Sequence, residues 1–269
     1  MDLQLKGRRA LVTGGSGGIG AGIARMLAEE GAEVVVHGRD RERTEKIAAD
    51  VGAAGVAVGD LSSDEGADAI YAQAAENLGG LDILVNNAGG TSGSSTIHRP
   101  PLEVSVPEWL FTYQNNALSS VRMILRAVPA MKAAGFGRVI QISSGVALQP
   151  NNLGPDYSAA KAAINNLTVS LAGSLKGSGV TVNTISPGPV ATPAMVDWAR
   201  GFAQTRGWGE LAEPELLRRL ALEVLDLPAG RLGAPEDIAM VVCLLASPRS
   251  DYITGANYRL DGGLLRSIN

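Results

Sequence analysis

The chain has 269 residues, of which 45% are hydrophobic and 4% are aromatic, and its formal net charge at pH 7 is −4. This length and composition suit one doubly wound α/β domain with a core built mainly from Ala, Val, Leu and Ile. The small negative charge argues against a nucleic-acid partner, because phosphate backbones require clustered lysine and arginine.

Apolar runs and helical patterns alternate along the whole chain. The predicted strands comprise residues 10–12, 33–39, 55–58, 81–85, 138–142, 180–185 and 257–260. The first predicted helix follows the glycines at 14–20. The others occupy 41–51, 62–78, a long segment from 107, 156–176, part of 193–227, and 235–246. This alternation predicts parallel β-α-β units in one domain, 1–269, with about seven strands and helices on both faces of the sheet.

Local signals predict where several of these elements begin and end. Ser62, followed three residues later by Glu65, resembles a capping box at the start of the helix that runs to 78. Pro107 suits the first turn of the long helix, and Pro129 is expected to end or kink it. The Gly-, Ser-, Thr- and Pro-rich segment 90–106 is predicted to be a surface loop.

The few cysteines and histidines and the hydropathy of the chain exclude further classes of protein. Cys243 is the only cysteine and lies in an apolar run, which favours a buried hydrophobe over a reactive thiol. His37 and His98 are isolated, so the sequence predicts no metal site. No segment is long and apolar enough for a membrane span, and the N-terminus lacks the apolar region of a signal peptide. We therefore expect a cytoplasmic protein that does not bind membranes.

A glycine-rich turn joins the first predicted strand to the first predicted helix. The stretch 11–20 reads Leu-Val-Thr-Gly-Gly-Ser-Gly-Gly-Ile-Gly, and its candidate cofactor residues are Gly14, Ser16, Gly18, Ile19 and Gly20. Glycines permit a sharp turn and close approach to a pyrophosphate, and the helix N-terminus offers unpaired N–H groups. The pattern indicates a dinucleotide site, although a glycine-rich turn without a ligand is also consistent with it.

Polar or small residues follow the other predicted strands. They are Arg39, Asp60, Asn87 to Gly89, Ser144, and Pro187 with Gly188. In an open parallel sheet, ligands bind outside the carboxyl ends of the strands, where all of these residues are expected to lie.

Tyr157 and Lys161 are four residues apart on a predicted helix and therefore share one face. A tyrosine has an ordinary pKa of about 10, and a neighbouring ammonium lowers it by favouring the phenolate. Ser144 is placed to donate a hydrogen bond to a substrate oxygen beside the tyrosine. The alternatives are a half-buried Tyr157 with a solvated Lys161 and, for Asn116 inside the long helix, a simple helix–helix hydrogen bond.

Together these motifs resemble the short-chain dehydrogenase/reductase family. The matching segments are Thr13-Gly14-x-x-x-Gly18-Ile19-Gly20, Asn86-Asn87-Ala88-Gly89, the set Asn116, Ser144, Tyr157 and Lys161, Pro187-Gly188 with Thr192, Arg231-Leu232-Gly233-x-Pro235-Glu236, Thr254-Gly255, and Asp261-Gly262-Gly263. They occur in the family's order from near Gly7 to Gly263, so the resemblance covers almost the whole chain. The resemblance implies a Rossmann-type fold.

The resemblance also implies a role for each matching residue. Tyr157 would be the general acid in ketone reduction and the base in alcohol oxidation, while Ser144 would orient and polarise the substrate oxygen. Lys161 would lower the pKa of Tyr157 and hold the nicotinamide ribose, and Asn116 would support a proton-relay water. The remaining implied cofactor contacts are Asp60 and Leu61 to adenine, Asn87, Ala88 and Gly89 to the adenosine-side ribose, and Pro187, Gly188, Val190 and Thr192 to the nicotinamide end.

Two departures from the family pattern affect these expectations. The acidic residue that would hold an adenine ribose after the second strand is missing, because Gly38 stands there and Arg39 follows it. Arg39 is free to pair with a 2′-phosphate, which predicts NADP (NADPH) as the cofactor. The loop 90–106 is also longer than in many relatives, so its path near the pocket is not predicted.

The predicted function is an NADP(H)-dependent oxidoreductase that interconverts a ketone and a secondary alcohol, with a 3-oxoacyl thioester or another small carbonyl compound as substrate. The alternative is a catalytically silent cofactor-binding regulator or scaffold with the same fold. The resemblance implies a homotetramer or homodimer that pairs through the helices starting near Pro107 and Asp156. Residues 193–227 are predicted to form a substrate lid with glycine hinges, or else a helix pair docked permanently on the body.

Overall fold

The computed structural model describes residues 1–90, 100–150 and 154–266. His98 and residues 91–99 of the predicted loop lie outside the described residues.

The centre of the structure is a parallel seven-stranded sheet in the order β3-β2-β1-β4-β5-β6-β7. Its strands are β1 (Arg9–Val12), β2 (Glu33–Gly38), β3 (Gly55–Val58), β4 (Ile83–Asn86), β5 (Gly137–Ile142), β6 (Val180–Pro187) and β7 (Asn257–Leu260). Strand order reverses between β1 and β4, where Val12 pairs with Val36 on one side and Val85 on the other. The predicted doubly wound parallel sheet is therefore confirmed, and its switch point lies beside the glycine-rich loop.

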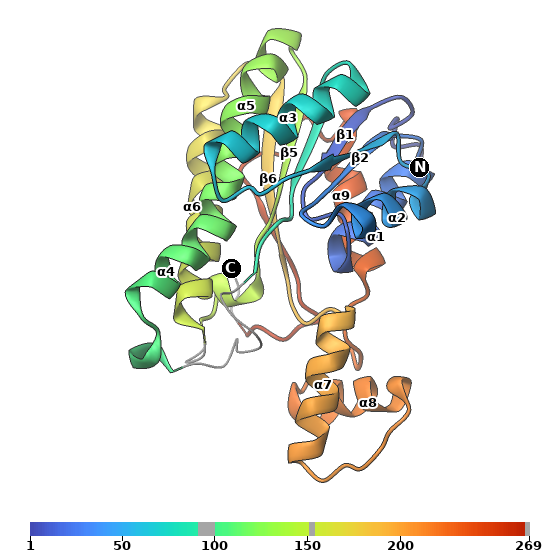
Figure 1. Cartoon of the computed structure of the whole chain (residues 1–269), viewed down its shortest axis with the longest axis vertical. Helices are drawn as coiled ribbons and strands as arrows, with labels where there is room; N and C mark the ends of the chain where they lie inside the picture. The colour runs from blue at the N-terminus through green and yellow to red at the C-terminus, as the bar shows by residue number, and fades with distance from the viewer. Residues whose placement is uncertain (91–99, 151–153, 267–269) are drawn as a thin grey trace.

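Helices cover both faces of this sheet (Figure 1). They are α1 (Gly18–Glu29), α2 (Arg41–Val51), α3 (Asp64–Leu78), α4 (Val106–Tyr113), α5 (Ser119–Ala134), α6 (Pro155–Ser174), α7 (Pro193–Thr205), α8 (Glu213–Arg219) and α9 (Pro235–Ala246). Helices α1, α2 and α9 pack on one face, whereas α3, α5 and α6 pack on the other.

Successive strand residues feed two separate apolar cores. Leu11 and Val35 belong to the core under α3 and α5, while their neighbours Val12 and Val36 belong to the core under α1 and α9. All four side chains are completely buried. Since adjacent side chains of a strand point to opposite faces, a sheet covered on both sides requires the continuous apolar runs seen in the sequence.

Two predicted helix ends differ from the structure. The N-cap of α3 is Ser63, whose Oγ accepts a hydrogen bond from the N–H of Gly66 at 3.1 Å, so the capping box predicted at Ser62 is wrong. Pro129 lies inside α5, which continues to Ala134 and ends at Gly135, where φ is +68°. A left-handed glycine, not the proline, therefore terminates this helix.

The long helix predicted from 107 is divided by a π-helical turn, Gln114–Leu118, between α4 and α5. This turn includes Asn116, which is completely buried. Single π-turns of this kind are frequent at functional sites.

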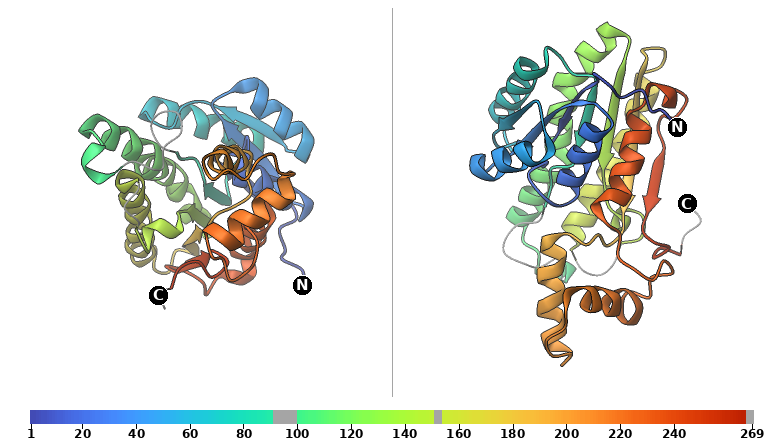
Figure 2. Two further views of the ribbon diagram at one scale, coloured as in Figure 1. Left: turned by 90° about the horizontal axis from the view of Figure 1, so that it is seen from below. Right: turned by 90° about the vertical axis from the view of Figure 1, so that its right-hand side faces the viewer.

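Helices α7 and α8 extend away from the end of the sheet (Figures 1 and 2). They have an apolar cluster of their own, which includes Ala199, Leu216 and Leu220. The Trp198 and Phe202 rings stack within it at a centroid separation of 5.3 Å, and Trp208 meets Phe202 edge-on at 6.1 Å. The segment thus packs mainly on itself. Gly201 lies inside α7, and Gly207 and Gly209 lie between α7 and α8, so none stands at a junction with the body, where the predicted hinges would be needed.

No helix in the described part of the chain combines the length and hydropathy needed to cross a membrane.

Candidate active site

The glycine-rich loop fits closely against the end of β4. Gly14 has a φ of +62°, and a Cβ atom added to it would lie 2.9 Å from Cα of Ala88. A Cβ at Gly20, in the first turn of α1, would lie 2.5 Å from Nδ2 of Asn87. Only glycine permits these approaches, which bring the N-terminus of α1, with its unpaired N–H groups, to the carboxyl edge of the sheet.

Thr13 and Asn87 lock this loop in place. Oγ1 of Thr13 accepts hydrogen bonds from the N–H groups of Asn87 and Ala88, each at 3.0 Å. Nδ2 of Asn87 donates to the carbonyls of Thr13 at 3.0 Å and Gly14 at 3.1 Å. Nδ2 of Asn87 is therefore engaged by the loop, and the ribose contact that the resemblance implies for Asn87 stays a prediction.

A cavity of about 280 Å³ opens at the ends of β1, β2 and β3. It is lined by seven of the predicted cofactor residues, namely Gly14, Ser16, Arg39, Asp60, Leu61, Ala88 and Gly89. Sequence reasoning missed His37, Arg43, Phe111 and Asn115, which also line it. The other predicted cofactor residues, Gly18, Ile19, Gly20, Asn87, Tyr157, Lys161, Pro187, Gly188, Val190 and Thr192, do not line this cavity.

Arg43 places a second guanidinium beside Arg39 in this cavity. It lies in the first turn of α2, where Asp40 caps the helix by accepting from the N–H of Arg43 at 2.8 Å. Its Nε donates to the carbonyl of Ser16 at 2.8 Å. A cation in the first turn of a helix opposes the helix dipole, but Arg41 stands in the same turn, so this signal alone does not distinguish Arg43 in the sequence.

Packing, as well as charge, explains why a glycine stands at position 38. A Cβ at this position would lie 2.7 Å from Oγ of Ser16. Oγ1 of Thr44 would lie nearer still, so any side chain at the end of β2, an acidic one included, is disfavoured by the present packing of α2 and the glycine-rich loop.

His37 connects the ends of three strands. Its Nδ1 accepts a hydrogen bond from the N–H of Gly14 at 3.1 Å, and Nε2 lies 3.2 Å from the carbonyl of Gly59. This arrangement places the ring proton on Nε2. Burial lowers the pKa of His37 to about 4, so the ring is neutral near pH 7.

Ser144, Tyr157 and Lys161 come together at the end of β5, as the sequence predicts. Ser144 follows this strand, and Gly154, with a φ of +68°, leads into α6, which carries the other two. A hydrogen bond joins the side chains of Tyr157 and Ser144. Nζ of Lys161 lies 5.6 Å from the centre of the Tyr157 ring and donates to the carbonyl of Ile142 at 2.9 Å.

The pKa of Tyr157 is raised, not lowered as the sequence predicts. Burial of the phenol is the larger cause, and the hydrogen bond with Ser144 opposes it. Burial also lowers the pKa of Lys161 to about 8. Desolvation disfavours both charged forms, so Tyr157 keeps its proton near neutral pH and is suited to donate it.

Asn116 holds the segment after β4. Its Nδ2 donates to the carbonyls of Gly90 at 2.6 Å and Thr112 at 2.8 Å, and its Oδ1 accepts from the N–H of Gly90 at 3.1 Å. A Cβ added to Gly89 would lie 2.5 Å from Oδ1 of Asn116 and 3.3 Å from Nζ of Lys161. Asn116 and Lys161 therefore converge on Gly89, and the alternative of a simple helix–helix hydrogen bond does not describe this residue.

The predicted nicotinamide-end residues lie on the other side of the glycine-rich loop from Arg39. The N–H of Gly188 donates to the carbonyl of Leu260 at 2.9 Å. A Cβ at Gly18 would lie 3.4 Å from Cγ2 of Thr192, which places the segment after β6 beside the start of α1. Val190 forms a bridge with Gly233, which anchors the same segment.

These features fit a dinucleotide. Glycines leave room at a helix N-terminus, and two guanidinium groups line the cavity at the ends of β1 to β3. The half-buried Tyr157 and the buried Lys161 lie near the end of β5, on the other side of β1 in the sheet. Among the described residues, no group of three or more His, Cys, Asp or Glu side chains is arranged to hold a metal ion.

Comparisons with known proteins agree with this geometry. The sequence pattern of the family described as Enoyl-(Acyl carrier protein) reductase matches residues 14–265. The 3-oxoacyl-(acyl-carrier-protein) reductase FabG of Vibrio cholerae is 33% identical, covering 97% of this chain and 99% of the relative. The 3beta-hydroxysteroid dehydrogenase 1 of Eggerthella lenta is 35% identical, covering 97% of this chain and 95% of the relative.

A solved structure is similar over the whole chain. L-sorbose reductase from Gluconobacter frateurii, complexed with NADPH and L-sorbose, has a TM-score of 0.91 and 32% sequence identity, with both chains covered completely. The NADPH in that complex agrees with the cofactor that the sequence predicts. The motifs, the sheet order and these matches lead to one conclusion: the chain belongs to the short-chain dehydrogenase/reductase family of oxidoreductases.

Proposed function

We propose that the protein is an NADP(H)-dependent oxidoreductase that interconverts a ketone and a secondary alcohol, with Tyr157 as its general acid and base. The observation that carries this proposal is the half-buried Tyr157, whose hydroxyl is hydrogen-bonded to Ser144, with Nζ of Lys161 5.6 Å from the centre of its ring. A phenol that is protonated near neutral pH holds a transferable proton, which the reduction of a ketone requires.

The cavity supports NADP(H) over NAD(H). Arg39 and Arg43 both line it, and packing disfavours an acidic residue at position 38. Guanidinium groups recognise phosphate through charge-assisted, often bidentate hydrogen bonds. The 2′-phosphate of the adenosine ribose therefore has two candidate partners, while Asp60 and Leu61 border the same cavity on the adenine side.

Ser144, Tyr157 and Lys161 would each have a separate role in the reaction. When bound, NADPH supplies the hydride that the carbonyl carbon accepts. Ser144 donates a hydrogen bond that orients and polarises the carbonyl oxygen. Tyr157 transfers its Oη proton to that oxygen, and the alcohol forms. Lys161 stabilises the resulting phenolate until Tyr157 is reprotonated, and oxidation of the alcohol reverses these steps.

The proposed substrates are 3-oxoacyl thioesters and other small carbonyl compounds. Support comes from relatives named as a 3-oxoacyl reductase, a 3beta-hydroxysteroid dehydrogenase and an L-sorbose reductase, since each name refers to a carbonyl or hydroxyl compound. Residues 193–227 are proposed to be the lid that sets substrate size, because α7 and α8 follow Thr192 directly and have their own apolar cluster.

The exposed apolar side chains of α4, α5 and α6 support the proposed homotetramer or homodimer. Leu110, Leu125 and Val169 remain 61%, 66% and 64% exposed, respectively. Burial of such side chains against a second copy would remove their contact with water.

A panel of β-keto esters, acyl thioesters, cyclic ketones and steroids, assayed by NADPH oxidation, tests the activity. We expect turnover of at least one class. NADPH binding without turnover of any class would favour the silent regulator or scaffold instead.

A further inference from the structure

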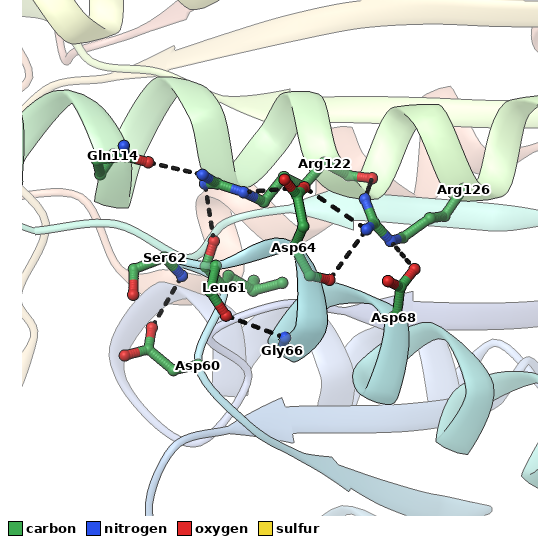
Figure 3. A network of polar contacts seen from close by, with 10 residues as sticks. Asp60, Leu61, Ser62, Asp64, Gly66, Asp68, Gln114, Arg122 and Arg126 are labelled. Carbon is green, nitrogen blue, oxygen red and sulfur yellow. Dashed lines mark hydrogen bonds and ion pairs between the residues drawn. The ribbon is translucent and has the colours of Figure 1, made fainter.

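Arg122 joins two parts of the site that are far apart in the sequence (Figure 3). It lies on α5, and its side chain is only 12% exposed. Nη1 donates to the carbonyl of Leu61 at 3.1 Å, and Nη2 donates to Oε1 of Gln114 at 2.7 Å. Nε lies 3.3 Å from Oδ1 of Asp64 in an ion pair.

The first acceptor belongs to the cofactor cavity. Leu61 lines the cavity beside Asp60, in the short loop between β3 and α3. Asp60 is itself held by the loop, since its Oδ1 accepts from the N–H of Ser62 at 2.9 Å. The bond from Arg122 therefore fixes the backbone of the loop whose residues border the adenine side.

The second acceptor belongs to the turn that carries Asn116. Gln114 is the first residue of the π-helical turn Gln114–Leu118. Asn116 in that turn holds Gly90 and lies near Gly89 beside Lys161. The bond to Gln114 therefore holds a turn that reaches the catalytic side through Asn116 and the cofactor cavity through Asn115.

Arg126, one turn further along α5, provides a matched comparison. Its Nε donates to Oδ1 of Asp68 at 2.7 Å, and its Nη2 donates to the carbonyl of Asp64 at 2.9 Å. Its Nη1 donates to the carbonyl of Arg122 at 3.0 Å. Arg126 thus fastens α5 to α3 with a similar number of donors, but none of these bonds goes to Leu61 or Gln114.

We propose that Arg122 is a positioning residue that links the adenine-side loop to the turn of Asn116, so that one guanidinium sets both cofactor affinity and turnover. The planar guanidinium presents donors in several directions and serves both acceptors at once, which a lysine ammonium on a flexible stem does not. The consequence for catalysis rests on the proposed function. The link between the two segments does not depend on it.

The test compares Arg122→Met, Arg122→Lys and Gln114→Leu with the control Arg126→Met. Three quantities are measured well below each variant's melting temperature: the Kd of NADPH, kcat on the best substrate, and amide hydrogen exchange without ligand. Amide exchange needs neither cofactor nor substrate, so it tests the link by itself. A wild type that neither binds NADPH nor turns over a substrate would overturn the proposed function and leave the exchange test of the link intact.

We expect Arg122→Met to lower kcat and to weaken NADPH binding indirectly, by at most about 10- to 100-fold, which is what loss of a hydrogen bond to a charged group costs. Exchange should accelerate at 60–63 and at 113–118 together. Gln114→Leu should lower kcat and accelerate exchange at 113–118, with exchange at 60–63 as in the wild type, and Arg122→Lys should not restore both kcat and the Kd of NADPH. Arg126→Met should lose stability but keep Kd and kcat.

Three results would overturn the link. The first is wild-type exchange at either segment in Arg122→Met. The second is an Arg126→Met enzyme whose Kd and kcat change as much as those of Arg122→Met, because the effect would then be general destabilisation. The third is full recovery of both quantities by lysine, which would make charge alone sufficient.

Discussion

His37 accepts a hydrogen bond through Nδ1 from the backbone N–H of Gly14 at 3.1 Å. This bond ties the end of β2 to the glycine-rich loop, and it requires a neutral ring. Burial lowers the pKa of His37 to about 4, while nearby Asp60 raises it and Arg39 lowers it by smaller amounts.

Stability should therefore fall as His37 becomes protonated. An unfolded histidine titrates at about 6.5, so its contribution is complete above that pH and is lost as the pH falls toward 4. Each pKa unit corresponds to about 1.4 kcal/mol, which gives a loss of about 3 kcal/mol in all. Urea unfolding of the wild type and His37→Gln between pH 4 and 7 measures this, since carboxylates common to both cancel. Parallel curves for the two proteins would contradict it.

Arg39 and Arg43 should set the preference for NADPH over NADH. Loss of either guanidinium removes a charge-assisted hydrogen bond and should weaken NADPH binding by about 10- to 100-fold, with NADH little affected. Arg41→Ala is the matched control, because this exposed α2 residue pairs with Glu45 and is not among the residues that line the cavity. Titration of Arg39→Ala, Arg43→Ala and Arg41→Ala with both cofactors gives the answer. An unchanged preference in the first two would show that the 2′-phosphate binds elsewhere.

Closure of the lid should be visible at its two ends. Because α7 and α8 pack on each other around their own apolar cluster, we expect the segment to move as a body about residues 190–193 and 225–231. Amide exchange there should be fast in the free enzyme and slow in the presence of NADPH and a substrate analogue. Exchange that is slow from the start and insensitive to ligand would indicate a permanently docked helix pair.

The oligomer should depend on the apolar faces of α5 and α6. A charge at Leu125 or Val169 would be buried without a partner in the proposed interface, so Leu125→Glu and Val169→Glu should dissociate it. Leu222→Glu is the control, because Leu222 is 44% exposed but lies in the lid segment. Sedimentation velocity distinguishes the states. A monomeric wild type, or a full-size oligomer in both variants, would contradict the proposal.

The fold was predictable because parallel strands covered on both faces need uninterrupted apolar runs. Leu11 and Val12 illustrate this, since each enters a different core. Element ends were less predictable. β6 continues to Pro187 because that residue pairs with Leu260, a contact that depends on a strand more than 70 residues later.

The sequence predicts which side chains meet when they lie on neighbouring elements of the chain. It misses contacts between residues that the fold brings together from distant positions. Tyr157, Lys161 and Ser144 meet because one strand and the following helix carry them. Arg43 reaches Ser16 across 27 residues, and His37 reaches Gly14 across 23. The pKa of Tyr157 depends on burial, which helical spacing with Lys161 does not reveal.

The central claim is that Tyr157 transfers the proton, and its most direct test is kcat of Tyr157→Phe on the best ketone at saturating NADPH. Removal of a placed acid should lower kcat by about 10²–10⁴-fold, with the Kd of NADPH unchanged. Tyr71→Phe, which removes a hydroxyl from α3, should keep wild-type kcat. A Tyr157→Phe enzyme with near-normal kcat and intact NADPH binding would contradict the account.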